Sequence, residues 1–367
     1  MVEAGPESYD IIIVGAGPAG SSAAQAASKM GAEVLLIDRK QRVGVPVQCA
    51  EFVPQWTSRC IDFSPTCILQ TVETVAVHLP NGACHEMRSP GYMLDRSRFD
   101  KELAAGAALF GAHISTETKV SDVSDQGVIV EDGPQQKLIR SKVTIGADGV
   151  HSTLARCMGQ PAAKTIAALQ YEVVIPKAQD HIDIFFHRDY EGGYAWFFPK
   201  GKTANAGLGV IPSMVFRLPD LLNDFLRSLE SSRILSSIEI LSKTGGSIPA
   251  EPRRQTVFGN LLLVGDAAGH AHPITGGGIL NAVIGGEMAG RIAARAVAKG
   301  DMGLLKEYEV EWNEAFGRSL SYGFSKREFL EKNWSKPGND FEGLIRKTWV
   351  GFKEYYLERR GDSWNPG

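Results

Sequence analysis

The sequence predicts an α/β protein built from a Rossmann-like dinucleotide-binding domain, an inserted antiparallel sheet that holds the substrate, and a helical C-terminal part. Three observations support this prediction. A short apolar strand near the N-terminus runs into a glycine-rich turn, β-rich runs follow one another between residues 170 and 211, and the sequence after residue 304 is helix-like and dense in aromatic residues. We expect a discontinuous dinucleotide-binding domain at residues 9–165 and 251–300, a substrate domain at 166–250 and a helical region at 301–367.

The first strand and its turn predict a dinucleotide site. Residues 11–14 form a wholly apolar run, typical of a parallel strand buried on both faces, and the G-x-G-x-x-G of Gly15, Gly17 and Gly20 follows directly. Gly15 permits the tight turn, Gly17 lets backbone N–H groups approach a pyrophosphate, and Gly20 lets the helix and strand pack closely. A small-residue helix and a second strand lead to Asp38, which is placed to accept a hydrogen bond from a ribose hydroxyl. The motif alone does not say which dinucleotide binds.

Composition argues against several classes of protein. The chain has 367 residues, a formal net charge of −3 and a pI near 6.3, which argues against nucleic-acid binding. Its five cysteines include no C-x-x-C pair and have no histidine at zinc spacing, so we expect no metal site and reduced thiols in a cytoplasmic protein. The longest apolar stretch, residues 279–298, is interrupted by three charged residues, so we expect no membrane span.

Later segments add candidate parts of the nucleotide site. A buried strand ends in Asp148-Gly149, and a helix opens near Arg96, which is either a solvated charge at the helix start or a residue that reaches the cofactor. Further along, a strand ends in Asp266, and a loop with three consecutive glycines leads into a long helix of small residues. Glycines at a helix start leave backbone N–H groups open to an anion or to the polar edge of a ring.

The β-rich runs predict an antiparallel sheet that can form a platform over a substrate cavity. They read QYEVVI, HIDIFFH, GYAWFFP and NAGLGVI, and they are bounded by proline, glycine and aspartate. Strand alternation places Tyr194, Trp196 and Phe198 on one face of the sheet. That face is either ordinary core packing or the wall of a cavity.

Taken together, GAGPAG near the N-terminus, GADGV in the middle and GDAAG…PITGGG late in the chain resemble the FAD-dependent fold of the para-hydroxybenzoate hydroxylase superfamily. The resemblance covers about residues 10–298 and implies FAD as the cofactor. It also implies that Asp266 contacts the ribityl or phosphate region, and that the helix after the glycine run points at the flavin. The FAD-binding residues that it implies are Gly15, Gly17, Ala19, Gly20, Asp38, Arg39, Cys49, Ala50, Arg96, Val120, Asp148, Gly149, Asp266, Gly277, Gly278 and Ile279.

Two motifs narrow the resemblance to the geranylgeranyl reductase family. The P-V-Q-C-A-E of residues 46–51 resembles the family's P-V-x-C-[AG]-E, and the Y-x-W-x-F-P of residues 194–199 with the later G-x-G is similar to its substrate motif. The resemblance implies a reductase that hydrogenates isolated double bonds of a prenyl lipid by flavin hydride plus proton transfer. The substrate-binding residues that it implies are Tyr194, Trp196, Phe198, Gly207 and Gly209.

Cys49 is the candidate catalytic residue. By itself this cysteine is either a small apolar filler or a thiol that faces the isoalloxazine ring. The resemblance implies the second interpretation, with Cys49 as proton donor or as the group that positions the alkene. A neutral thiol suits that role, so an apolar pocket that raises its pKa would help.

The electron donor and the relation to membranes stay open. No second G-x-G-x-x-G is present for a nicotinamide cofactor, so we expect electrons from transiently bound NAD(P)H, from ferredoxin or from another small carrier protein. Between residues 326 and 360, nine Lys and Arg stand against six Asp and Glu. The C-terminal helices are therefore either a cap over the substrate domain or a peripheral membrane face that admits the lipid.

Three rival functions fit parts of the pattern. A class A flavin monooxygenase would hydroxylate a small or lipophilic substrate, but the loop from Cys49 to Glu51 looks reductase-like. A flavin halogenase needs a lysine to relay hypohalous acid, and the chain has none between Lys40 and Lys101. The third rival is a non-catalytic flavoprotein, against which the aromatic motif argues.

Overall fold

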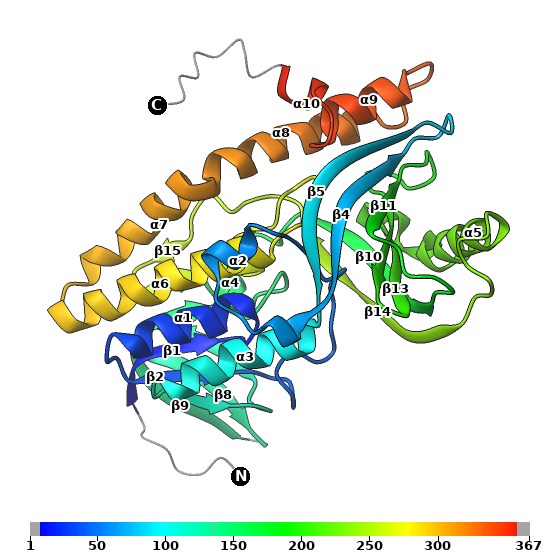
Figure 1. The fold of residues 1–367 in the computed structure, drawn as a ribbon. Coiled ribbons are helices and arrows are strands. Elements are labelled where there is room, and N and C mark those ends of the chain that lie inside the picture. The colour runs from blue at the N-terminus through cyan, green and yellow to red at the C-terminus, as the bar shows by residue number, and fades with distance from the viewer. Residues whose placement is uncertain (1–7, 134, 358–367) are drawn as a thin grey trace.

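The computed structural model describes residues 8–133 and 135–357 and contains two sheets surrounded by helices (Figure 1). Helices α1, α3 and α6 lie over the first sheet, and the second sheet stands beside them with α5 on its outer side (Figure 1). The predicted C-terminal helical region runs to residue 367, so its last ten residues lie outside the described part of the chain.

The first sheet contains the strand that the glycine-rich turn predicts. Its main strand order is β15-β16-β9-β1-β2-β6, with β1 parallel to both β9 and β2, while β8 adds antiparallel to β9 and β7 to β8. The strands are β1 (Ser8–Val14), β2 (Val34–Ile37), β6 (His113–Ser115), β7 (Val120–Ser124), β8 (Gly127–Asp132), β9 (Gln135–Gly146), β15 (Val257–Phe258) and β16 (Leu261–Leu263).

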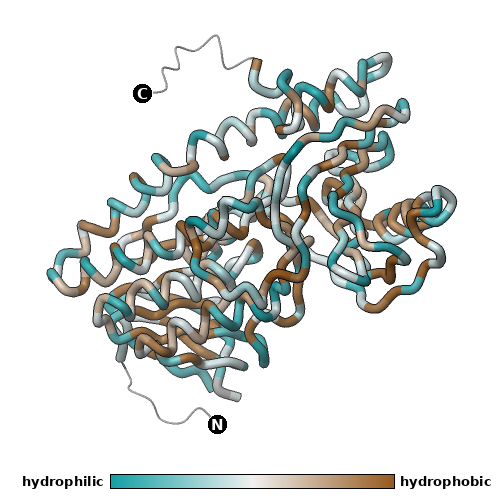
Figure 2. Tube along the Cα trace, viewed as in Figure 1, coloured by the Kyte–Doolittle hydropathy of each residue, from teal (hydrophilic) through white to brown (hydrophobic). Residues whose placement is uncertain are grey.

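Small residues let the helices over this sheet approach one another. A Cβ at Gly286 would lie 2.1 Å from the carbonyl oxygen of Ala19, and a Cβ at Gly290 would lie 2.1 Å from that of Ala23. The backbones of α1 and α6 therefore touch, above strands whose hydrophobic residues stand out in Figure 2. The helices are α1 (Pro18–Lys29), α3 (Arg96–Leu109), α4 (Thr153–Cys157) and α6 (Ile279–Lys299).

The second sheet contains all four predicted β-rich runs. Its strand order is β14-β10-β13-β12-β11-β4-β5-β3, and every pair is antiparallel except β11 with β4. Three of its strands come from residues 52–94, inside the range predicted for the dinucleotide-binding domain. The strands are β3 (Phe52–Pro54), β4 (Ile68–His78), β5 (Cys84–Leu94), β10 (Thr165–Val174), β11 (His181–Phe185), β12 (Ala195–Lys200), β13 (Thr203–Val210) and β14 (Ile240–Pro249).

The two faces of the second sheet are covered by different helices. Ala195 and Phe197 pack with α5 (Leu218–Ser231), whereas Tyr194, Trp196 and Phe198 pack with residues of the C-terminal helices. The predicted alternation is thus confirmed. The C-terminal helices are α7 (Lys306–Trp312), the π-helical turn η5 (Asn313–Gly317), α8 (Arg318–Asn333), α9 (Phe341–Thr348) and α10 (Glu354–Leu357).

A buried arginine fastens α8 to two loops of the rest of the molecule. Arg327 donates to the carbonyl oxygen of Pro273 from Nε at 2.9 Å and from Nη2 at 2.8 Å, and Nη1 donates to the carbonyl oxygen of Gly192. Burial lowers the pKa of Arg327, and the nearby Glu331 acts in the opposite direction. The C-terminal helices are therefore bonded both to the late glycine loop and to the turn before β12.

The predicted fold class is confirmed, because the chain combines an α/β dinucleotide-type sheet, a mainly antiparallel second sheet and a helical C-terminal part. Within the described ranges, no helix is long and apolar enough to cross a membrane. The remaining short helices are α2 (Thr57–Cys60), η1 (Pro65–Cys67), η2 (Pro212–Arg217), η3 (Gly265–Ala268) and η4 (Met302–Leu305).

Candidate active site

The turn after β1 combines crowded and open glycine positions. Gly15 has a φ of +105°, and a Cβ there would lie 2.3 Å from the carbonyl oxygen of Ala147. A Cβ at Gly20 would lie 1.8 Å from the carbonyl oxygen of Gly15, so both positions require glycine. At Gly17 no described atom beyond its chain neighbours lies within 4 Å of where a Cβ would be. No side chain in the described part of the chain caps the start of α1, so its first backbone N–H groups suit an anionic group; Ala19 in its first turn is buried.

Asp38 follows β2 directly and braces this turn. Its Oδ2 accepts a hydrogen bond from the backbone N–H of Ala16, and its Oδ1 accepts one from that of Lys40, both at 2.8 Å. A carboxylate has about four acceptor positions, so Asp38 keeps capacity for a ribose hydroxyl. The neighbouring Arg39 is exposed.

Asp148 uses its carboxylate within the protein. It accepts hydrogen bonds from Ser152 Oγ at 2.5 Å and from the backbone N–H of Thr153 at 2.7 Å, which caps the start of α4. Burial raises the pKa of Asp148, and the bond from Ser152 opposes this shift. Gly149, with a φ of +82°, has open space around its Cβ position among the described atoms, and Val120 is buried in the core.

The late glycine loop brings Asp266 close to the start of α6. Asp266 is half-buried, and burial raises the pKa of its carboxyl while the nearby Arg96 lowers it. Gly278 is the N-cap of α6, and no side chain in the described part of the chain caps this helix end. The predicted residues Gly277, Gly278 and Ile279 together form this uncapped N-terminus, which suits a polar or anionic group.

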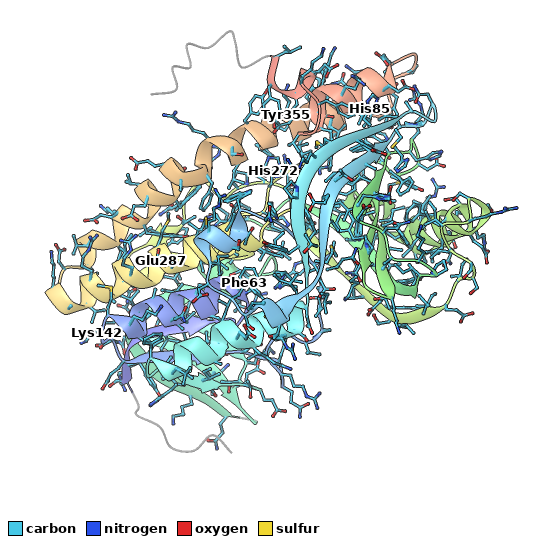
Figure 3. The ribbon with its side chains drawn as sticks, viewed as in Figure 1. Phe63, His85, Lys142, His272, Glu287 and Tyr355 are labelled. Carbon is cyan, nitrogen blue, oxygen red and sulfur yellow. The ribbon has the colours of Figure 1, made fainter. Side chains whose placement is uncertain are left out.

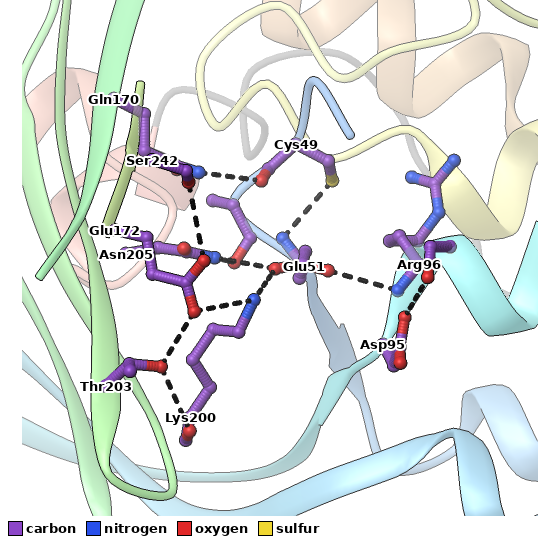
Figure 4. A network of polar contacts seen from close by, with 12 residues as sticks. Cys49, Glu51, Asp95, Arg96, Gln170, Glu172, Lys200, Thr203, Asn205 and Ser242 are labelled. Carbon is purple, nitrogen blue, oxygen red and sulfur yellow. Dashed lines mark hydrogen bonds and ion pairs between the residues drawn. The ribbon is translucent and has the colours of Figure 1, made fainter. Parts of the chain in front are cut away.

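Cys49 lies where these loops meet the second sheet (Figure 4). Its Sγ accepts a hydrogen bond from the backbone N–H of Glu51 at 3.2 Å, and its carbonyl oxygen accepts one from Gln170 Nε2 at 3.1 Å. The residue is half-buried, and burial raises the pKa of its thiol although the nearby Arg96 lowers it. The thiol is therefore protonated at neutral pH.

Glu51 is a buried acid at the centre of the same network. Its Oε2 accepts hydrogen bonds from Lys200 Nζ at 2.5 Å and from Asn205 Nδ2 at 2.9 Å, and its Oε1 accepts one from the backbone N–H of Arg96 at 3.0 Å. Asn205 Nδ2 also donates to the carbonyl oxygen of Ala50 at 3.2 Å. Figure 4 shows that these side chains reach the cysteine loop from the second sheet.

The sequence prediction missed the polar partners of this loop. Gln170, Lys200 and Asn205 lie on the face of the second sheet that carries the aromatic residues. They could have been found as polar residues at inward positions of strands that are otherwise apolar. Their shared partner, the loop at residues 49–51, is distant in sequence and gave no sign of the pairing.

Arg96 is largely shielded from solvent and paired with an acid, so the interpretation as a solvated charge at the helix start is wrong. Its side chain is 13% exposed and forms a two-point ion pair with Asp100, with Nε to Oδ1 at 2.9 Å and Nη2 to Oδ2 at 3.0 Å. Burial alone would lower the pKa of Arg96, but Asp100 and Cys49 raise it. The guanidinium thus interacts electrostatically with Cys49 and with Asp266.

The predicted G-x-G of β13 makes room for an indole ring. A Cβ at Gly207 would lie 2.2 Å from Cζ2 of Trp196, its direct cross-strand partner, and one at Gly209 would lie 3.9 Å from Cζ3 of the same ring. The indole Nε1 donates to Gln170 Oε1 at 2.8 Å. Since Gln170 also donates to Cys49, the indole is linked to the cysteine loop through one side chain.

The aromatic face is closed by side chains of the C-terminal helices. The Tyr194 hydroxyl donates to the carbonyl oxygen of Thr275 at 2.6 Å, and its ring lies 5.0 Å from that of Trp349 between centroids. Phe198 packs edge-on against Phe52. The enclosed cavity beside Tyr194 and Trp349 holds only about 10 Å³, whereas an open groove of about 1270 Å³ lies along α7 and η5, away from Cys49.

Comparison with known proteins identifies the family. Residues 165–248 match the geranylgeranyl reductase catalytic domain, and residues 10–45 match the FAD dependent oxidoreductase family. A digeranylgeranylglycerophospholipid reductase of Methanocaldococcus jannaschii is 36% identical over 341 residues, which are 88% of this chain and 87% of that protein. The chain belongs to the geranylgeranyl reductase family. Another digeranylgeranylglycerophospholipid reductase, from Methanococcus aeolicus, is 35% identical over 347 residues, 90% of this chain and 88% of that protein.

Solved structures agree with this membership. A geranylgeranyl bacteriochlorophyll reductase-like protein of Thermoplasma acidophilum superposes with a TM-score of 0.84 at 27% identity, over 96% of this chain and 95% of that one. A flavin-dependent brominase superposes with a TM-score of 0.72 at 18% identity, over 94% and 90%, which shows a shared fold only. The predicted FAD cofactor and the predicted reductase class are thus confirmed at the level of the family.

The residues of this chain fit FAD. The uncapped starts of α1 and α6 are positions where backbone N–H groups can hold phosphate oxygens and the polar edge of the flavin. Gly17 and Gly149 leave spaces that a Cβ would fill. Asp38 retains acceptor capacity for a ribose hydroxyl, and Asp266 has a carboxylate near the start of α6.

Proposed function

We propose that this protein hydrogenates isolated double bonds of geranylgeranyl chains carried by a glycerophospholipid. The observation that supports this most directly is the position of Cys49 between the second sheet and the candidate FAD site. Its carbonyl oxygen accepts a hydrogen bond from Gln170 of the second sheet, and its thiol interacts with Arg96, a predicted FAD-binding residue. The named substrates of the relatives, digeranylgeranylglycerophospholipids, supply the substrate class.

An isolated double bond is a poor hydride acceptor, so its reduction needs a hydride on one carbon and a proton on its neighbour. When bound and reduced, FAD would supply the hydride. In this proposal the Cys49 thiol supplies the proton, since burial raises its pKa and keeps it protonated. Tyr194, Trp196 and Phe198 keep water away and stabilise positive charge that develops on the protonated chain.

Substrate binding in this proposal involves a movement of the side chains that close the aromatic face. The cavity beside Tyr194 and Trp349 is too small for a prenyl chain, so a chain that enters between these two rings displaces side chains of α9 and its flanking turn. Each CH₂ group of the chain that leaves water contributes about 0.8 kcal/mol, which is enough to offset that rearrangement over a long chain.

An anaerobic single-turnover experiment tests the function. The bound flavin is reduced with dithionite, the geranylgeranyl lipid is added, and flavin reoxidation is followed together with mass spectrometry of the lipid. We expect reoxidation with a gain of two hydrogen atoms for each double bond reduced, and no reoxidation with the fully saturated lipid as control. If the flavin stays reduced until oxygen enters and the substrate then gains an oxygen atom, the protein is a monooxygenase.

The role of Cys49 has its own test within the same experiment. Cys49→Ala is expected to slow lipid-dependent reoxidation at least about a hundredfold while FAD stays bound, because the loss of a general acid typically costs that much. Full turnover in Cys49→Ser would exclude the thiol as proton donor.

Membrane contact and electron supply complete the proposal. The C-terminal part carries the exposed residues Lys347 and Lys353 as well as the exposed side chains of Tyr356 and Leu357, which suits contact with an anionic lipid surface. We expect co-sedimentation with anionic vesicles and less of it after Lys347→Glu and Lys353→Glu.

Flavin reduction by NAD(P)H or by reduced ferredoxin, measured separately, decides between the electron donors.

A further inference from the structure

The backbone at Glu51 has an unusual conformation. Its φ is +71°, in the left-handed region that residues with a side chain rarely adopt. This conformation directs its N–H at Cys49 Sγ, at 3.2 Å. A residue stays in such a conformation only when its surroundings hold it there, so the contacts of the Glu51 side chain decide where the thiol lies.

Three segments that are distant in sequence hold the Glu51 side chain. Lys200 from β12, Asn205 from β13 and the backbone of Arg96 at the start of α3 all donate to its carboxylate. The carboxylate is 4% exposed and the Lys200 side chain 13% exposed, so this is a buried ion pair. Buried ion pairs add little net stability compared with apolar packing, whereas they can fix a geometry.

Arg96 belongs to the same contact network as the thiol, because its backbone N–H donates to Glu51 Oε1 at 3.0 Å and the N–H of Glu51 donates to Cys49 Sγ. The two-point ion pair with Asp100 fixes the guanidinium of Arg96, and its charge acts on Cys49. The charged groups that face the thiol are Arg96, Glu51 and Asp100. Arg96 favours the thiolate and the two acids oppose it.

We propose that Glu51 and Lys200 are positioning residues that fix the Cys49 thiol, and that Arg96 is the counter-ion of the thiolate left when this thiol protonates the substrate. This inference rests on the proposed function. The S–H bond breaks, the π electrons of the double bond form a C–H bond with the proton, and sulfur keeps the electron pair of the broken bond. The neighbouring carbon takes the hydride that the reduced FAD of the proposed function supplies, and the thiolate later regains a proton from water.

Alkylation of the thiol across pH tests the counter-ion. Holoenzyme with Cys60→Ser and Cys84→Ser, which removes the two exposed cysteines, is treated with iodoacetamide, and the peptide that contains Cys49 is quantified by mass spectrometry. In Arg96→Met we expect the midpoint of the alkylation profile to rise by about one pH unit or more, which is about tenfold slower alkylation below the midpoint. Arg96→Lys, which keeps the charge, is expected to retain most of the original profile.

A matched control separates the counter-ion from charge in general. Lys119→Met removes a cation from an exposed ion pair with Glu131 and is expected to leave the profile unchanged. A midpoint in Arg96→Met within about 0.2 pH units of the parent enzyme would overturn the counter-ion role.

Single-turnover kinetics test the positioning residues. Lys200→Met is expected to slow lipid-dependent flavin reoxidation at least about tenfold, with FAD content and lipid affinity unchanged, because only the placement of the proton donor is lost. Lys200→Arg is expected to recover most of the rate. The double variant Glu51→Gln with Lys200→Met keeps a neutral buried pair, so it tests the same point if the single variant does not fold.

The outcomes distinguish this inference from the proposed function. If the parent enzyme reduces prenyl lipid and Lys200→Met turns over at the parent rate, the positioning role is wrong and the function stands. If no prenyl lipid is reduced while Arg96→Met still shifts the thiol profile, the proposed function fails and the electrostatic pairing of Arg96 with Cys49 stands.

Discussion

The turn after β1 and the G-x-G of β13 are both built from glycines, but the space that these glycines leave is used in opposite ways. Around Gly17 the described chain leaves open space, in which a ligand can approach the start of α1. At Gly207 the space is filled by the indole ring of Trp196. A glycine motif therefore says only that a side chain is excluded. Whether a ligand or the protein itself fills the space depends on neighbours from elsewhere in the chain.

The largest expected effect comes from a glycine that is crowded by backbone. In Gly20→Ala the new Cβ would lie 1.8 Å from the carbonyl oxygen of Gly15, which cannot move without opening the turn. We expect the free energy of unfolding to fall by about 3 kcal/mol or more, measured by urea denaturation of the FAD-free protein. A decrease in unfolding free energy of less than about 1 kcal/mol would mean that the turn deforms more easily than its contacts indicate.

The second largest loss of stability is expected at Gly207, over which the indole ring of Trp196 lies. In Gly207→Ala the Cβ would lie 2.2 Å from a ring atom of Trp196, and the ring can shift at the expense of its bond to Gln170. We expect a loss of about 2 kcal/mol in unfolding free energy with unchanged FAD affinity. Trp196→Leu makes room for the methyl group. In the Trp196→Leu protein, Gly207→Ala is therefore expected to lower the free energy of unfolding by less than it does in the parent protein. Weaker FAD binding in the single variant would place the G-x-G with the ligand-facing glycines.

The late glycine loop, which contains His270, is expected to behave as a packed region. The His270 ring lies 4.9 Å from Trp312 and 5.0 Å from Phe316 between centroids, its nitrogens have no hydrogen-bond partner among the described residues, and burial lowers its pKa to about 3. The unfolded chain has the ordinary pKa of about 6.5 and so binds the proton more readily. The contribution to stability is therefore complete above pH 6.5 and is lost as the pH falls toward 3.

Urea denaturation at several pH values checks this expectation. At pH 5 the buried neutral ring should have lost about 2 kcal/mol of its contribution to the free energy of unfolding. In His270→Phe the dependence on pH between 6.5 and 5 should decrease by that amount. An unchanged dependence would show that the ring reaches solvent, as expected of an open loop. The neighbouring His272 (Figure 3), whose pKa burial lowers to about 4, is kept in both proteins.

The smallest effect on stability is expected at the open glycine. In Gly17→Ala the new methyl group meets no described atom, so the unfolding free energy of the FAD-free protein should change by less than about 1 kcal/mol. FAD affinity, followed by quenching of flavin fluorescence, should fall about tenfold or more, since the methyl group occupies the space that a pyrophosphate needs. An unchanged affinity together with lost stability would reverse the comparison between the two motifs.

Much of the fold could be predicted from the sequence because local patterns specified it. The apolar run before Gly15 and the alternation around Trp196 both fix strand positions without reference to distant residues. The hairpin of β4 and β5 was missed, although β4 alternates between exposed and buried residues over part of its length. Its place in the second sheet depends on parallel pairing with β11, about a hundred residues away, and no local pattern contains that information.

The site shows the same division. Cys49 and the loop glycines belong to short motifs and could be named from the sequence, whereas Lys200 and Asn205 resemble ordinary polar residues of a strand. Their role appears only when folding brings Glu51 to them. For the face of Tyr194, Trp196 and Phe198 the sequence left open core packing or a cavity wall, and it gave no sign that the indole ring of Trp196 lies over Gly207.

The hydrogen bonds of Arg327 on α8 have a consequence for the order in which parts of the protein can fold during synthesis. Gly192 and Pro273 leave the ribosome well before Arg327, which donates to both of their carbonyl oxygens. Domains generally fold as units during synthesis, starting from the N-terminal part. The two loops can therefore take their final positions relative to each other only after translation has passed residue 327, so a nascent chain with both sheets already formed still lacks a finished reaction chamber.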